Sequence, residues 1–428
     1  MMNYLNAELE LLEKEKLLLS EQYEQIKRKN LNLDISRGKP SEDQLDISVP
    51  MLDIINSGSS YKTESGVDCR NYGLMDGLPS CKKLFAEMMQ VEPDMVMVGG
   101  NSSLNLMFDV VSALMTKSIE EECSPWLEVK DRKFLCPVPG YDRHFGVTEY
   151  YGFEMINVPM LETGPDMDIV EQKVSEDASI KGIWCVPKYS NPQGVTYSDE
   201  TVRRFANLKP KAKDFRILWD DAYCVHDLED ETVRLLSLWE ECKKAGNEDI
   251  AVFFSSTSKI TFAGAGVASM ASSLKNMKFF KNRYKYQTIG YDKINMQRHI
   301  LFLKDYNGVL EHMKKNREIL KPRFDLVFSK LNDLEKDIGV IRFQKPHGGY
   351  FVSVDVLEGT AKKVVSLCKS AGLVLTPAGA TYPYFNDPKD SNIRLAPTYP
   401  SIEELDAAMD VFCICVKLAA LERLTTNG

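Results

Sequence analysis

Lys259 lies in a sequence context suited to carbonyl chemistry. It follows an apolar, strand-like run and a turn rich in hydroxyl side chains, and it precedes a glycine-rich loop. At the end of a buried strand, burial can lower the pKa of a lysine amine and allow it to form a Schiff base. The neighbouring hydroxyls of Ser256 and Ser258 are suited to hold a phosphate. A lysine among serines is more often a solvated loop residue, so this interpretation depends on partners elsewhere in the chain.

A second group of small polar residues follows the apolar run 95–98 and precedes a helical pattern over 104–115. Free backbone amides, the helix dipole and side-chain hydroxyls make such a junction suitable for an anion. A plain helix cap formed by one of these side chains is the competing interpretation. The residues of the junction are Gly99, Gly100, Asn101, Ser102 and Ser103.

Three further strand-like runs are followed by residues that could hold a flat, charged ring. Tyr141 stands on a proline-fixed turn after run 133–136 and could stack on the ring. Asn191, in the turn Asn-Pro-Gln-Gly, could donate a hydrogen bond to a phenolate oxygen. Asp220, after run 215–218, could keep a pyridinium nitrogen protonated. A rim tyrosine, a simple turn and a helix-capping aspartate are the respective alternatives.

Arg394 lies inside the apolar segment Asn392–Leu395. A buried arginine needs a carboxylate, which its planar guanidinium can bind through two nitrogens. A structural ion pair is the alternative to a substrate carboxylate. In an open parallel sheet, ligands bind beyond the carboxyl ends of the strands. Because the candidate groups follow strand-like runs in chain order, we expect them to meet at one site.

The elements that must position these residues alternate along the chain. Alternation of short apolar runs with helical patterns predicts an α/β fold with a mostly parallel sheet covered by helices on both faces. Residues 276–330 read as a helical connector, the last hundred residues repeat strand and helix signals, and residues 3–29 read as one charged helix. The predicted strands of the sheet are Met95–Val98, Lys133–Cys136, Gly182–Val186, Phe215–Trp219, Ala251–Phe254 and Val267–Ala271.

The chain of 428 residues is too long for a single hydrophobic core. We expect an N-terminal helix and extended arm over 1–50 that joins the small domain. Residues 51–310 are expected to form the large domain, and residues 311–428 the small C-terminal domain.

The bulk composition excludes several classes of protein. A net charge of −9 argues against nucleic acid or an anionic membrane as the main partner. Ten cysteines without a CxxC pair and five histidines without ligand spacing predict free thiols and no metal site. No apolar run has membrane length, and the N-terminus does not resemble a secretory leader. A cytoplasmic protein is therefore expected.

Taken in order, these motifs resemble those of fold type I pyridoxal phosphate enzymes, and specifically class I/II aminotransferases. The resemblance covers essentially the whole chain. The segment Ser256–Gly266 resembles the lysine signature of the MocR-like aspartate aminotransferases. The matching residues are Tyr72 to Gly77, Gly99 to Ser103, Pro139 to Tyr141, Asn191 to Gly194, Asp220 to Tyr223, Ser256 to Lys259, and Arg394.

The resemblance implies a large domain with a mostly parallel seven-stranded sheet, a smaller α+β domain, and a homodimer with shared active sites. It also implies pyridoxal 5'-phosphate as the cofactor, bound to Lys259, which would then move the proton of the substrate's α-carbon. The resemblance further implies that Asp220 binds the ring nitrogen, that Asn191 and Tyr223 bind the ring oxygen, and that Tyr141 stacks on the ring. The implied phosphate ligands are Asn101, Ser102, Ser103, Ser256, Ser258 and, from the neighbouring subunit, Tyr72. The implied substrate-binding residues are Arg394, Asn191 and Gly38.

One departure from the family pattern concerns the phosphate. The wider family carries an arginine shortly after the glycines that follow the lysine, whereas residues 264–268 here contain no basic side chain. Phosphate binding would then rest on hydroxyls, amides and a basic group from elsewhere.

The leading functional hypothesis is an aminotransferase that acts on L-aspartate and 2-oxoglutarate. A dicarboxylate preference needs a second cation; the candidates are Lys293, Arg298, Arg37 and Arg143, although Lys293 and Arg298 also read as surface helix residues. The alternatives are a β-lyase on the same scaffold or a transaminase for aromatic or aminoadipate substrates, which aromatic side chains at Tyr382, Tyr384 and Phe385 would favour. A non-catalytic pyridoxal phosphate sensor or interaction protein is the hypothesis from another class.

Overall fold

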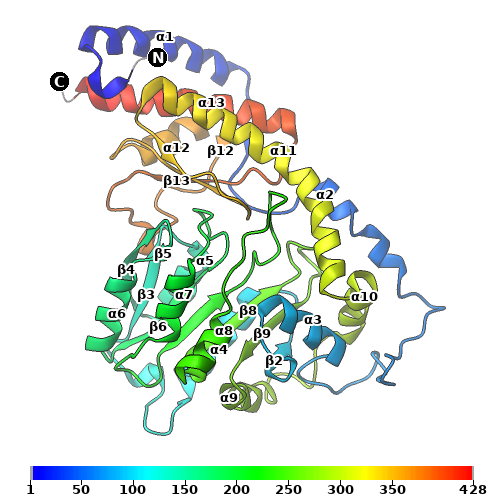
Figure 1. The fold of residues 1–428 in the computed structure, drawn as a ribbon. Helices are drawn as coiled ribbons and strands as arrows, with labels where there is room; N and C mark the ends of the chain where they lie inside the picture. The colour runs from blue at the N-terminus through cyan, green and yellow to red at the C-terminus, as the bar shows by residue number, and fades with distance from the viewer. Residues whose placement is uncertain (1–2, 427–428) are drawn as a thin grey trace.

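The computed structural model describes residues 3–426 and contains a large central sheet covered by helices, with a smaller layered body on one side of it (Figure 1). The strand order is β2-β9-β8-β7-β6-β3-β4-β5. The strands β8, β7, β6, β3 and β4 pair in parallel, whereas β9 is antiparallel to both of its neighbours and β5 is antiparallel to β4. Their bounds are β2 Val96–Val98, β3 Lys133–Val138, β4 Glu154–Leu161, β5 Gly164–Pro165, β6 Ile180–Cys185, β7 Arg216–Asp220, β8 Ala251–Ser256 and β9 Ala268–Ser272.

All six strands expected for this sheet are present, but β4 was not predicted from the sequence. The missed strand lies near the edge of the sheet and alternates buried and exposed residues, with Asn157 and Pro159 interrupting its apolar residues. The central strands β6, β7 and β8 are buried at every position. They read as continuous apolar runs because both of their faces are covered. With β4, the sheet has the seven strands implied by the family resemblance, and the two-residue β5 extends its edge.

Helices on the two faces of the sheet pack into two separate hydrophobic cores. Side chains of successive residues alternate between the two, as the period of a strand requires: Ile217 and Trp219 face one core and Leu218 faces the other. One core includes α3 Pro79–Met89, α6 Met167–Glu176, α7 Asp199–Ala206, α8 Leu238–Ala245 and α10 Lys293–Leu303, and the other includes α4 Ser103–Thr116, α5 Asp142–Tyr150 and α9 Leu274–Tyr284.

The smaller body combines both ends of the chain. The helix α1 (Leu9–Arg28) packs on α13 (Ile402–Thr426), and β1 (Leu33–Asp34) pairs in parallel with β12 (Leu373–Val374) (Figure 1). A third core is formed by buried residues of these segments and of α11 (Tyr306–Ile338). The remaining elements are α2 Glu42–Asp46, α12 Ala361–Ser370, and the antiparallel strands β10 Arg342–Phe343, β11 Val352–Asp355 and β13 Asn392–Leu395.

The expected helical connector over 276–330 is divided among three helices. The first two, α9 and α10, pack on the large sheet, and only α11 (Tyr306–Ile338) runs from the large sheet to the smaller body (Figure 1). No helix among residues 3–426 is long and apolar enough to cross a membrane.

Candidate active site

A cavity of about 150 Å³ lies where β7 and β8 end and α4 begins. Residues from five separate segments line it because parallel strands carry their carboxyl ends to the same edge of the sheet. Of the predicted site residues, it is lined by Ser102, Ser103, Tyr141, Asn191, Asp220, Tyr223, Ser256, Ser258 and Lys259. Sequence reasoning missed the apolar part of the lining, which consists of Leu104, Met107, Val186 and Ala222.

The amine of Lys259 is fixed inside this cavity. Its Nζ donates a hydrogen bond to the hydroxyl of Tyr223, at 3.0 Å. Burial lowers the pKa of Lys259, and the positive charge of Arg394 adds to this effect, whereas Tyr141 and Asp220 oppose it. Burial also raises the pKa of Tyr223, so its hydroxyl keeps its proton. The arrangement provides an amine that loses its proton more easily than an ordinary lysine.

Asp220 presents one paired and one unpaired carboxylate oxygen. His144 Nε2 lies 3.1 Å from Oδ2, and the imidazole stacks on the Trp184 ring with 4.4 Å between centroids. The other oxygen, Oδ1, is buried without a hydrogen-bond partner within residues 3–426. Such an atom is costly unless a ligand pairs with it. The side chain therefore fits a protonated ring nitrogen in the cavity.

His144 was not among the predicted site residues. Its contact with Asp220 joins positions 76 apart in the chain. The only signal in the sequence was its place three residues after Tyr141, in the first turn of α5. That position alone does not indicate a partner.

Asn191 and Arg394 connect the cavity to the smaller body. The guanidinium Nη1 of Arg394, on β13, donates to Asn191 Oδ1 at 3.2 Å. The amide group of Asn191 then keeps its NH₂ available, as a phenolate oxygen would require. Arg394 also forms an ion pair with Asp142, at 2.8 Å, and its guanidinium lies over the Phe351 ring, 4.9 Å from the centroid.

Gly38 supports the arginine indirectly. A Cβ atom built at Gly38 would lie 2.5 Å from the ring of Phe351, so the close approach of the arm to this ring requires glycine. The same ring lies beneath the guanidinium of Arg394. The arm therefore packs against the aromatic ring on which the guanidinium of Arg394 lies.

The expected phosphate end of the cavity is built from hydroxyls and a helix N-terminus. Ser102 is the N-cap of α4, and Ser256 Oγ donates to Ser258 Oγ at 3.2 Å. Ser258 Oγ in turn donates to the carbonyl of Asn101, at 3.2 Å. The Asn101 side chain is not part of the cavity lining; it donates to the carbonyl of Gly264, at 3.3 Å, and ties the two loops together. Among the described lining residues, Lys259 is the one cation.

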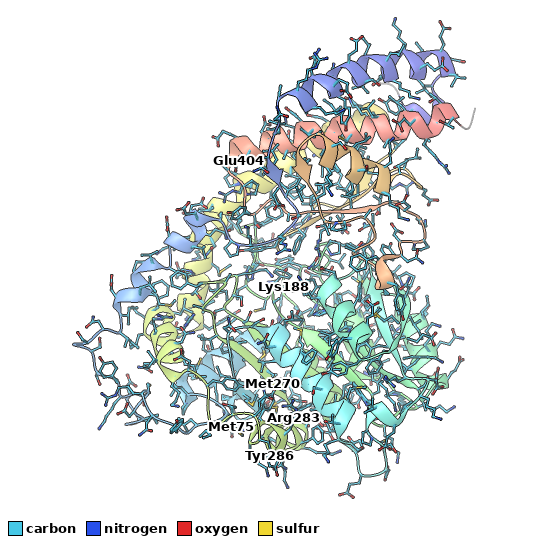
Figure 2. All side chains as sticks on the ribbon, turned by 180° about the vertical axis from the view of Figure 1, so that it is seen from behind. Met75, Lys188, Met270, Arg283, Tyr286 and Glu404 are labelled. Carbon is cyan, nitrogen blue, oxygen red and sulfur yellow. The ribbon has the colours of Figure 1, made fainter. Side chains whose placement is uncertain are left out.

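The loop that carries Tyr72 lies outside the cavity. Tyr72 is 83% exposed. Lys293 was a candidate for the second substrate cation, with a surface helix lysine as the alternative. The surface interpretation is wrong, because Lys293 is buried and its Nζ donates to the Gly73 carbonyl at 2.9 Å. A Cβ at Gly290 would lie 2.7 Å from the same carbonyl, so the two loops are adjacent. Figure 2 shows Met75, next along this loop, at the end of the molecule away from Glu404 of α13.

The other candidates for a second substrate cation or an aromatic pocket do not line the cavity. Arg298 Nη2 donates to Asn295 at 2.6 Å, and Arg37 and Arg143 are exposed. The Tyr384 hydroxyl accepts a hydrogen bond from the Met155 amide at 3.0 Å. The cavity lining includes none of these residues, nor Tyr382 or Phe385.

Solved structures of other proteins are similar to this chain in fold, and one of them also in sequence. A solved structure of an aspartate transaminase from Corynebacterium glutamicum matches with a TM-score of 0.96 and 41% identity over 99% of both chains. The α-aminoadipate aminotransferase of Thermus thermophilus, solved with N-(5'-phosphopyridoxyl)-L-leucine, matches with a TM-score of 0.74 and 18% identity, covering 92% of this chain and 93% of that one. The fold is the one shared by pyridoxal phosphate-dependent aminotransferases.

Sequence relatives narrow the class further. An aspartate aminotransferase of Corynebacterium glutamicum is 42% identical over 404 residues, which cover 94% of this chain and 93% of that protein. A family model described as aspartate amino-transferase matches residues 10–427. The chain therefore belongs to this aminotransferase family.

Proposed function

We propose that the protein is a pyridoxal phosphate-dependent aminotransferase that transfers the amino group of L-aspartate to 2-oxoglutarate. One observation carries the proposal: the amine of Lys259, whose pKa is lowered by burial, meets Asp220 in one cavity, and one carboxylate oxygen of Asp220 has no hydrogen-bond partner in the part of the chain that the structure describes. The aspartate substrate is supported by the relative named aspartate aminotransferase, which is 42% identical over 94% of this chain.

The lining residues fit the parts of pyridoxal phosphate. Asp220 would bind the ring nitrogen, Asn191 and Tyr223 the ring oxygen, and Tyr141 the ring face, while Ser102, Ser103, Ser256 and Ser258 would bind the phosphate. When bound, pyridoxal phosphate supplies an electron-accepting ring that makes the Cα–H bond of an amino acid acidic.

The side chains of this protein have three tasks in the proposed reaction. Lys259 binds the cofactor and moves the proton of the substrate's α-carbon, which its lowered pKa favours because a neutral amine can accept a proton. Tyr223 holds the amine in place through its hydroxyl. Arg394 binds the substrate α-carboxylate and thereby orients the Cα–H bond.

A homodimer would complete the phosphate end of the site. The phosphate carries negative charge, yet its proposed ligands are neutral hydroxyls and the N-terminus of α4. Exposed apolar side chains on the two adjacent loops, Tyr72, Leu74 and Ile289, support a subunit contact there. We place Tyr72 in the neighbouring subunit's site, with Lys293 holding its loop through the Gly73 carbonyl.

Three finer assignments accompany the proposal. The segment Ser256–Gly266 supports membership of the MocR-like subgroup. The three hydrophobic cores support a division into the arm 1–50, a large domain 51–310 and a small domain 311–428. Ten free cysteines are in keeping with a reducing cytoplasm.

The visible absorption spectrum of the purified protein tests the function. Adding L-aspartate without an oxo acid should convert bound pyridoxal phosphate to pyridoxamine phosphate and release one equivalent of oxaloacetate. A bound cofactor that aspartate leaves unchanged would contradict the substrate and lead to a panel of aromatic and aminoadipate substrates. Ammonia and pyruvate in place of oxaloacetate would indicate a β-lyase.

A further inference from the structure

The guanidinium of Arg394 is already paired with a carboxylate of the same chain. Its Nη1 lies 2.8 Å from Asp142 Oδ1, and the exposed fractions of the two side chains are 7% and 27%. The remaining hydrogen bonds are weaker: Nη1 to Asn191 at 3.2 Å and Nε to Thr376 at 3.4 Å. A charge-assisted bond in so little solvent is stronger than the same pair on the surface.

Asp142 is held in this position by the backbone around it. It is the first residue of α5, directly after Tyr141, and the helix dipole favours a carboxylate there. The preceding turn is fixed by a hydrogen bond from the Gly140 amide to the Thr381 carbonyl, at 2.7 Å. A Cβ at Gly140 would lie 2.6 Å from the Phe145 ring, so the turn is also tightly packed. Asp142 is therefore a positioned group and not a mobile surface acid.

A substrate carboxylate must compete with this pair. A carboxylate binds two nitrogens on one edge of a guanidinium. Asp142 Oδ1 already accepts a hydrogen bond from Nη1, so a carboxylate on the edge formed by Nη1 and Nη2 must displace it. At the edge formed by Nε and Nη2, the nearby charge of Asp142 would repel an incoming anion. In both geometries the carboxylate of Asp142 opposes binding.

We propose that Asp142 is an internal competitor for the substrate α-carboxylate: it neutralises Arg394 in the empty site and weakens the binding of substrates and products. This inference rests on the proposed function, in which Arg394 binds that carboxylate. A buried arginine without a partner would be costly, so Asp142 also preserves the orientation of the guanidinium between turnovers. Weaker binding of a dicarboxylate product speeds its release.

Calorimetric titration with succinate, a dicarboxylate without an amino group, tests the proposal on the cofactor-loaded protein. In Asp142→Asn the Kd for succinate should fall about tenfold, which corresponds to about 1.4 kcal/mol. Glu149→Gln removes one negative charge from the exposed side of the same helix and should leave the Kd unchanged. The KM for aspartate should fall with the Kd, while kcat stays within about threefold.

An equal or higher Kd in Asp142→Asn would overturn the proposal, as would undetectable binding in both proteins; binding that appears only in the variant supports it. Asp142→Ser replaces the asparagine variant if that one does not fold. Failure of the proposed function can be distinguished from failure of this inference. In that case the wild-type protein binds the cofactor, but aspartate leaves the bound cofactor unchanged.

Discussion

The two ends of the site differ in whether their charged side chains are paired within the protein. At the cofactor end, one buried oxygen of Asp220 has no hydrogen-bond partner among the described residues 3–426, and His144 contacts the other. At the substrate end, the guanidinium of Arg394 forms an ion pair with Asp142. A buried group without a partner favours a ligand that stays bound, whereas a group with an internal partner favours a ligand that exchanges. This difference matches a resident cofactor beside a substrate that leaves after each turnover.

The largest effect is expected at the cofactor end, from Lys259→Ala. Without the amine there is no group to move the α-proton, so turnover should fall by at least about 10⁴-fold. Single-turnover absorbance with aspartate measures this, and circular dichroism checks that the variant is folded. Transamination at a rate near that of the wild type would remove the central role of Lys259.

Asp220→Asn should lower kcat by about 10²–10³-fold, because a neutral amide no longer stabilises the charge on the ring nitrogen. The neighbouring Asp221→Asn is a matched control. Burial raises the pKa of Asp221 well above its ordinary value, which favours the neutral carboxyl, so the change to asparagine should remove less charge here than at Asp220. Steady-state kinetics of both variants give the comparison; equal losses would mean that Asp220 is not the residue facing the ring nitrogen.

At the substrate end, Arg394→Ala should raise KM about a hundredfold, the loss expected for a charge-assisted pair of bonds. The effect should be similar for every accepted amino acid, since all carry the same α-carboxylate. KM values for aspartate and for a monocarboxylate amino acid decide this. A loss confined to dicarboxylates would assign Arg394 to the distal carboxylate instead.

The smallest effect concerns the support of the lysine loop. His299 Nε2 lies 2.9 Å from Thr261 Oγ1, and its Nδ1 lies 2.8 Å from the Asn295 carbonyl. Burial lowers the pKa of His299 to about 4, below the ordinary 6.5. The unfolded chain therefore binds more protons between these values, and stability is lost as the pH falls from 6.5 towards 4.

Urea unfolding at pH 7.5 and pH 5 measures this loss. His299 should account for about 1–2 kcal/mol of the decrease in unfolding free energy. His299→Gln should show a correspondingly smaller decrease, because glutamine does not titrate. An unchanged decrease would assign the acid sensitivity to other groups, of which His226 is the first to test because burial also lowers its pKa, to about 3.

Much of the cofactor end could be predicted from local sequence. Central strands such as β7 and β8 are buried on both faces and read as apolar runs, and a parallel sheet carries the residues after each run to one edge. The strand β4, next to the edge of the sheet, was missed because Asn157 and Pro159 interrupt its apolar residues. The burial of Lys293 was also missed, because the sequence around a lysine on a charged helix does not indicate that its amine binds a distant backbone carbonyl.

The sequence by itself determined which chemical groups follow the strands, and hence the class of chemistry, because strand formation and strand ends depend on neighbouring residues. Only the tertiary structure decided how these groups are paired. His144 reaches Asp220 across 76 positions, and Asp142 reaches Arg394 across 252. Such contacts depend on how distant segments pack and on the solvent they exclude, and neither property is encoded in a local pattern.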